Sequence, residues 1–107
     1  MQRLARLDIA RFEAKAAAAA RLLKALANEH RLMILCKLAE GELSAGELVV
    51  ASGLSQSALS QHLAKLRADR LVTTRRDAQT IYYRLTGAEA ARVLQVLADI
   101  YCPSPRR

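Results

Sequence analysis

The stretch SAGELVVASGLSQSALSQHLAKLRADRLVTTRRDAQTIYYRL, residues 44–85, decides the fold of this 107-residue chain. Ser44 and Glu47 form a capping-box pattern that opens a short helix, and Gly53 is suited to end it. Ser55 is a good N-cap for the next helix, which we expect to run over about 55–70. The stretch therefore begins with two short helices joined by a tight turn.

A β-hairpin is predicted directly after these helices. The runs 71–75 and 80–84 are rich in β-branched and aromatic residues, and Arg76-Asp77-Ala78-Gln79 separates them. Two short helices followed by a basic hairpin are the order of a winged helix-turn-helix. The predicted fold class is mainly α (α+β), with the second helix, 55–70, as the recognition helix and residues 71–85 as the wing.

Three further helices are expected around this stretch, within a single domain that spans residues 1–107. One covers about 8–27, where apolar residues recur at helical spacing. Another follows the N-cap Asn28, covers 29–39 and is apolar nearly all round, which predicts a buried helix. The last covers about 87–101, opened by a second capping box, Thr86-Gly-Ala-Glu89.

The last helix carries more apolar surface than one small core uses. Its first stripe is Ala90, Leu94, Leu97 and Tyr101, and its second is Val93, Val96 and Ile100. One stripe covers the protein's own core, and the other needs a partner, most simply the same helix of a second copy. We therefore expect a homodimer through the helices at 8–27 and 87–101.

The charge balance narrows the class of partner. The formal net charge is +7, and residues 55–85 hold six basic and two acidic side chains. A basic excess at the recognition helix and wing favours the phosphate backbone of DNA. We find no secretory signal pattern and no apolar run long enough to span a membrane, so we expect a cytoplasmic protein without a membrane partner.

The predicted recognition helix has one apolar side and one polar side. Leu59, Leu63 and Leu66 share one side of the helix, which predicts burial. The other side offers amides, hydroxyls and one lysine, side chains that hydrogen-bond to base edges and phosphates. The hairpin adds two arginines and an outward tyrosine. The predicted DNA-binding residues are Ser55, Gln56, Ser57, Ser60, Gln61, His62, Lys65, Arg75, Arg76 and Tyr82.

Four segments of the chain resemble the ArsR family of bacterial winged-helix repressors. They are Leu26-Ala-Asn-Glu-His-Arg-Leu-Met-Ile-Leu35, Gly46-Glu-Leu48, Leu54-Ser-Gln-Ser-Ala-Leu-Ser-Gln-His-Leu63 and the wing, residues 75–85. The resemblance implies a homodimer that binds an imperfect palindrome in double-stranded operator DNA and releases it when a signal binds.

The metal-sensing signatures of that family are missing. The arsenic type has Cys-x-Cys near the start of the third helix, where this chain has Ser44-Ala-Gly-Glu47. The zinc type needs several Asp and His residues on the last helix, and residues 87–101 hold no His. We therefore expect no metal site.

Two cysteines, Cys36 and Cys102, remain as candidate sensors. Their placement is similar to the BigR- and SqrR-like branch of the family, which implies a dithiol that persulfides convert into a polysulfide-bridged form with lower DNA affinity. Alternatives are a sensor of general oxidants, or of haem through Cys102-Pro103, although no cofactor is expected.

An alternative function outside transcriptional regulation is that of a non-specific architectural DNA-binding protein. Such a protein would show little preference for a palindrome over other DNA. An enzyme is not expected, because the chain has no paired-carboxylate, Ser-His-Asp or phosphate-loop constellation.

Overall fold

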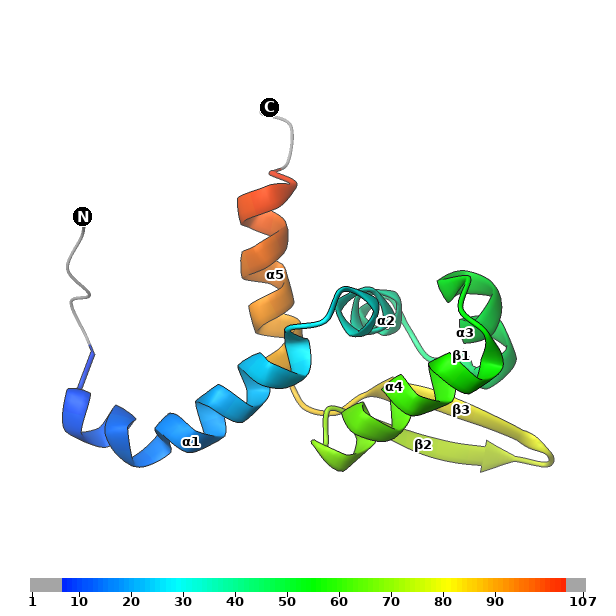
Figure 1. Cartoon of the computed structure of the whole chain (residues 1–107), viewed down its shortest axis with the longest axis horizontal. Coiled ribbons are helices and arrows are strands. Elements are labelled where there is room, and N and C mark those ends of the chain that lie inside the picture. The colour runs from blue at the N-terminus through cyan, green and yellow to red at the C-terminus, as the bar shows by residue number, and fades with distance from the viewer. Residues whose placement is uncertain (1–6, 104–107) are drawn as a thin grey trace.

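The structure, a computed structural model, describes residues 7–103. It is a winged helix-turn-helix of five helices with a small antiparallel sheet at one side of the molecule (Figure 1). In chain order the elements are α1 (Ile9–Leu26), α2 (Glu29–Ala39), β1 (Leu43–Ser44), α3 (Ala45–Ser52), α4 (Gln56–Ala68), β2 (Val72–Asp77), β3 (Thr80–Leu85) and α5 (Glu89–Tyr101). The predicted fold class and element order are confirmed, with β1 as an addition.

The helix starts follow from local side-chain hydrogen bonds. The Asn28 side chain accepts from the backbone N–H of Arg31 at 3.0 Å and opens α2. Ser44 accepts from the Glu47 N–H at 3.1 Å, and the Glu47 carboxylate accepts from the Ser44 N–H at 2.8 Å. Ser55 caps α4 as expected. These bonds satisfy amide groups that a helix N-terminus otherwise leaves without partners.

The predicted capping box at Thr86 and Glu89 is wrong. Ala88 is the N-cap of α5 and makes no side-chain capping bond. Thr86 instead donates its backbone N–H to the Leu71 carbonyl at 2.9 Å, which continues the edge of the hairpin. Glu89 is therefore the first residue of α5 rather than the third, too early for the reciprocal bond of a capping box.

The sheet has the strand order β1-β3-β2, and both pairings are antiparallel. Leu43 of β1 lies opposite Tyr83, and Val72 of β2 lies opposite Leu85. The hairpin strands are longer than predicted, because β2 continues to Asp77 and only residues 78–79 form the loop. The recognition helix is shorter than predicted, because it ends at Ala68.

The core lies where α2, α3, α4 and α5 meet the base of the sheet. Its fully buried large side chains are Ile34, Leu35, Leu48, Leu59 and Leu66. The prediction that α2 is apolar and buried all round is wrong in part, since Met33 is 53% exposed. Met33 lies on the side of α2 that also carries the exposed Glu29 and His30, which the neighbouring elements leave uncovered.

Two helices leave much apolar surface uncovered. In Figure 1, α1 and α5 extend away from the rest of the molecule in different directions. The radius of gyration is 15.9 Å, larger than the roughly 13 Å of a compact domain of this length. On α5, Ala90 and Leu94 are buried. Of the second stripe, Val96 and Ile100 are exposed as predicted, but Val93 is half-buried and packs against the core. Tyr101, assigned to the buried stripe, is 77% exposed, because it lies in the last turn, beyond the core.

Within residues 7–103, no helix is long and apolar enough to cross a membrane.

Candidate nucleic-acid interface and cysteine pair

The recognition helix α4 is anchored through one side and presents the other. Leu59, Leu63 and Leu66 are buried, as their spacing predicts. The exposed side carries the polar residues expected there, namely Ser55, Gln56, Ser57, Ser60, Gln61 and Lys65. Ser55 accepts from the Ala58 N–H at 3.1 Å and Lys65 lies 3.5 Å from Asp69, so Gln56, Ser57, Ser60 and Gln61 carry the exposed hydrogen-bonding groups that face away from the core.

The turn before α4 sets its angle to α3. Gly53 has a left-handed φ of 71° and donates its N–H to the Val49 carbonyl at 3.1 Å, which ends α3. Leu54 packs against the core and donates its N–H to the Ser52 hydroxyl at 3.1 Å. A residue with a Cβ would be strained at Gly53, so this glycine is needed for the turn.

His62 lies on the flank of α4, half-buried against the start of α2. Its ring centroid lies 5.7 Å from that of His30. Burial lowers the pKa of His62, and the nearby Arg31 and His30 lower it further. The neutral imidazole has one donor and one acceptor nitrogen, so His62 is able to bond to either kind of group.

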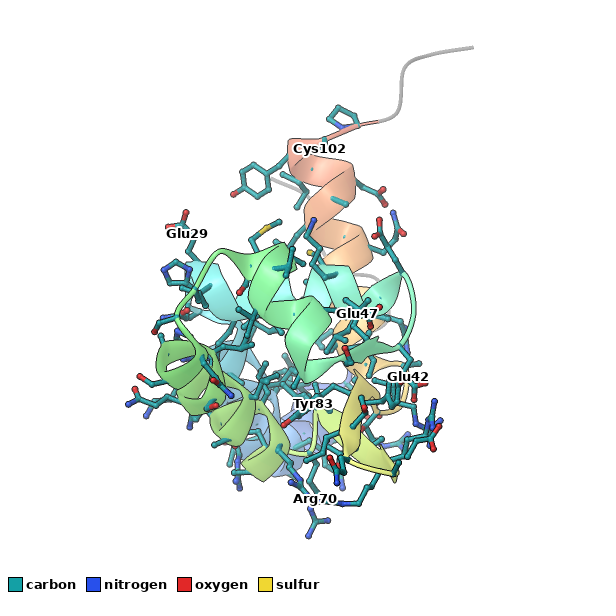
Figure 2. All side chains as sticks on the ribbon, turned by 90° about the vertical axis from the view of Figure 1, so that its right-hand side faces the viewer. Glu29, Glu42, Glu47, Arg70, Tyr83 and Cys102 are labelled. Carbon is teal, nitrogen blue, oxygen red and sulfur yellow. The ribbon has the colours of Figure 1, made fainter. Side chains whose placement is uncertain are left out.

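A groove lies between α3 and α4, with Tyr83 of β3 in its lining. Gln56, Ser60 and Tyr83 are among the residues that line it, and its volume is about 250 Å³. Tyr83 packs against the core, whereas its neighbour Tyr82 points to the other face of the sheet, as strand alternation predicts. Figure 2 shows Tyr83 in the middle of the molecule, between the hairpin and the helices.

Arg75 on the wing is already engaged within the chain. Its Nε donates to Glu42 Oε2 at 2.9 Å and its Nη2 donates to Glu42 Oε1 at 2.8 Å. The guanidinium also stacks over the Tyr82 ring, 4.3 Å from the centroid. In the part of the chain that the structure describes, Arg76 has no carboxylate within ion-pair distance.

The C-terminal end of α4 is tied to α1 by an acidic side chain. Asp69 accepts a hydrogen bond from Arg21 Nε at 2.9 Å and lies 3.5 Å from Lys65 Nζ. The bond from Arg21 holds the pKa of the Asp69 carboxyl below its usual range. This pair connects a helix expected at the dimer interface to the recognition helix.

The two cysteines are free thiols on different elements. Cys36 is half-buried on α2 and packs against the core, and Cys102 is exposed at the end of α5. Burial raises the pKa of the Cys36 thiol, and Glu40 raises it further against the opposing effect of Lys37. Figure 2 shows Cys102 at the end of the molecule opposite Arg70.

Within residues 7–103, no three His, Cys, Asp or Glu side chains lie close enough together to hold a metal ion. The polar face of α4 offers hydrogen bonding, and the two thiols offer sulfur chemistry.

Sequence reasoning misses three features of this region. Glu42 engages Arg75 across 33 residues, and Asp69 engages Arg21 across 48. The third feature is the position of His30 beside His62. No local pattern indicates these pairs, because the tertiary fold brings their elements together.

Comparison with known proteins gives consistent matches. Residues 28–74 match the family described as "Bacterial regulatory protein, arsR family". The transcriptional activator HlyU of Vibrio cholerae is 51% identical over 96 residues, which cover 90% of this chain and 89% of that protein.

Two solved structures have the same fold. Reduced HlyU from Vibrio cholerae superimposes with a TM-score of 0.81 at 52% identity, covering 88% of this chain and 99% of that one. The transcriptional repressor BigR from Xylella fastidiosa gives 0.86 at 43% identity, covering 92% and 100%.

Proposed function

Because the chain belongs to the ArsR family of DNA-binding transcriptional regulators, we propose that it acts in the cytoplasm as a homodimeric repressor of palindromic operators. The observation that carries this proposal is the exposed amide and hydroxyl face of α4 beside a basic wing. BigR, a relative of the same fold, is a repressor by name. HlyU is an activator by name, so the direction of regulation is part of the proposal.

In the proposed complex, α4 lies in the major groove. Gln56 and Gln61 are suited to adenine, and Ser57 and Ser60 bond to bases or phosphates. Ser55, His62, Lys65 and the wing residues Arg76 and Tyr82 flank this face and contact the backbone, whereas Arg75 on the same wing is paired with Glu42 in the free protein. The uncovered apolar surfaces of α1 and α5 support dimerisation, because burying them in a second copy removes them from water.

A selection experiment tests DNA recognition without assuming any operator sequence. Purified protein is used to enrich duplexes from a random pool, and the enriched sequences are measured against a scrambled control. We expect an imperfect palindrome with half-sites about one helical turn apart. Equal affinity for enriched and scrambled duplexes would support an architectural protein and refute the repressor proposal.

We further propose that Cys36 and Cys102 sense persulfides. Each thiolate attacks the outer sulfur of a small-molecule persulfide and takes up that sulfur while a thiol leaves. One protein persulfide then attacks the Sγ of the other cysteine, forms a trisulfide bridge and releases sulfide. The departing sulfide carries the two electrons that the thiols lose, so no other oxidant is needed.

The environments of the two thiols support different roles. Cys102 is exposed and accessible to a small molecule. Cys36 is half-buried with a raised pKa, so less of it is thiolate at neutral pH and it reacts second. The description of one HlyU structure as reduced supports a redox-active relative.

A bridge would connect α2 to the far end of α5. Cys102 lies eight residues after the buried Leu94, which is about 12 Å along a helix. Drawing this end toward α2 repositions the apolar stripe of α5 and hence the spacing of the two recognition helices. A coupling of about 1–3 kcal/mol would change operator affinity roughly 5- to 150-fold.

Gel-shift titration with the selected operator tests the sensing proposal. An organic persulfide should weaken binding by wild-type protein and leave Cys36→Ser and Cys102→Ser unaffected. Intact-mass analysis should show a gain of sulfur between the cysteines. A loss of two hydrogens alone would indicate a general-oxidant sensor, and equal affinity with and without persulfide would contradict sensing altogether.

A further inference from the structure

We propose that Glu42 weakens DNA binding by the wing, because its carboxylate competes with backbone phosphates for Arg75. The inference rests on the proposed function, because it requires the wing to lie against a duplex. Glu42 then lowers the affinity of the wing for DNA by keeping the Arg75 guanidinium paired, without contacting DNA itself.

The geometry of the pair is that of a phosphate contact. Arg75 donates from Nε and Nη2 to the two carboxylate oxygens of Glu42, at 2.9 and 2.8 Å. An arginine uses the same two-donor edge to bind a phosphate in a bidentate manner. Glu42 and a phosphate therefore compete for one edge of the guanidinium.

The rest of the guanidinium is also occupied. Tyr82 covers one of its faces at 4.3 Å from the ring centroid, and Nη1 lies 4.0 Å from an Asp77 carboxylate oxygen. Arg76 and Arg84 on the same hairpin have no such ion pair within residues 7–103. The three wing arginines are therefore not equivalent as cations.

The backbone of Glu42 is held in place by the fold. The next two residues form β1, in which Leu43 lies opposite Tyr83 and Ser44 opposite Tyr82. Ser44 is also the N-cap of α3. The sheet and the helix thus fix the segment that follows Glu42, and Figure 2 shows Glu42 beside the hairpin.

The pair is exposed enough for a phosphate to replace it. The side chains of Arg75 and Glu42 are 51% and 29% exposed, and ion pairs in contact with solvent are weak. Removing the carboxylate should therefore tighten DNA binding by about two- to fivefold. It should also steepen the dependence of log affinity on log salt concentration by about 0.9, the value for one additional phosphate contact.

The test uses Glu42→Gln and fluorescence anisotropy with the palindromic duplex enriched by selection, at roughly 50–200 mM salt. Glu89→Gln is the matched control, because it makes the same charge change on α5 and removes no side-chain capping bond. Arg75→Ala and the double variant complete the cycle. We expect tighter binding for Glu42→Gln, a change within about twofold for Arg75→Ala, and no gain from Glu42→Gln when Arg75 is absent.

Several results would overturn the inference. If Glu42→Gln binds no more tightly than Glu89→Gln, the carboxylate does not compete with DNA. If Arg75→Ala and Glu42→Gln both weaken binding severalfold, Arg75 contacts DNA and Glu42 positions it for that contact. Glu42 then does not compete with DNA for Arg75. If wild-type protein fails to bind the duplex, the proposed function falls together with the inference, whereas in the first two cases the proposed function stands.

Discussion

Replacing Arg70 with glycine should stabilise this protein. Arg70 follows α4 with a left-handed φ of 61°. Its N–H bonds to the Arg67 carbonyl at 3.0 Å, and the Leu71 N–H bonds to the Leu66 carbonyl at 2.9 Å. These two bonds form a Schellman motif in which Arg70 occupies the position that glycine favours.

The magnitude follows from two opposing contributions. A left-handed residue with a Cβ costs roughly 1–2 kcal/mol. Glycine loses more freedom on folding, which removes about 0.5–1 kcal/mol of that gain. Arg70→Gly should therefore raise the free energy of unfolding by about 1 kcal/mol, or roughly 4 °C in melting temperature.

Two neighbouring variants make this experiment specific. Arg70→Ala removes the same charge but keeps the Cβ, so it should show no comparable gain. Arg67→Gly lies within α4, where glycine costs about 1 kcal/mol, and should destabilise. Thermal melts followed by circular dichroism at one protomer concentration measure all three. The reasoning is refuted if Arg70→Gly is no more stable than Arg70→Ala.

Four further predictions concern other elements. Ala78 begins the hairpin loop at φ 58°, so Ala78→Gly should stabilise by about 0.5–1 kcal/mol in a urea titration; a loss would contradict this turn geometry. Ser44→Ala breaks the capping box and should cost about 1 kcal/mol in the same titration, whereas no change would mean that the cap is dispensable. Because the Asp69 pKa is lowered in the folded state, wild type should exceed Asp69→Asn in stability at neutral pH, and melts should show this advantage vanishing as pH falls below about 4. Ile100→Lys should shift the dimer toward monomer in sedimentation velocity, and an unaffected dimer would place the interface elsewhere.

Local chemistry explains what the sequence predicted well. Asn28, Ser44 and Ser55 each bond to an amide three residues ahead, so a short window holds both partners. The burial of Leu59 and Leu66 follows from helical periodicity in the same way. N-cap residues and the spacing of apolar residues were thus enough to predict the helix-turn-helix and the exposed face of the recognition helix.

The missed features depend on segments that are distant in sequence. β1 has two residues and exists only because β3 lies beside it, about 40 positions later. The capping box predicted at Thr86 does not form, because the backbone N–H of Thr86 bonds to the Leu71 carbonyl across the hairpin. The engagement of Arg75 by Glu42 likewise depends on tertiary structure, so the sequence placed Arg75 among free cations without indicating its partner.

The uncovered apolar faces of α1 and α5 have a consequence for the amount of protein in a cell. If pairing buries these faces, a lone protomer lacks part of the stabilisation of the dimer, and folding follows mass action. At low copy number more chains would be single, less stable and open to proteolysis. The population of competent regulator would then rise more steeply than the number of chains synthesised.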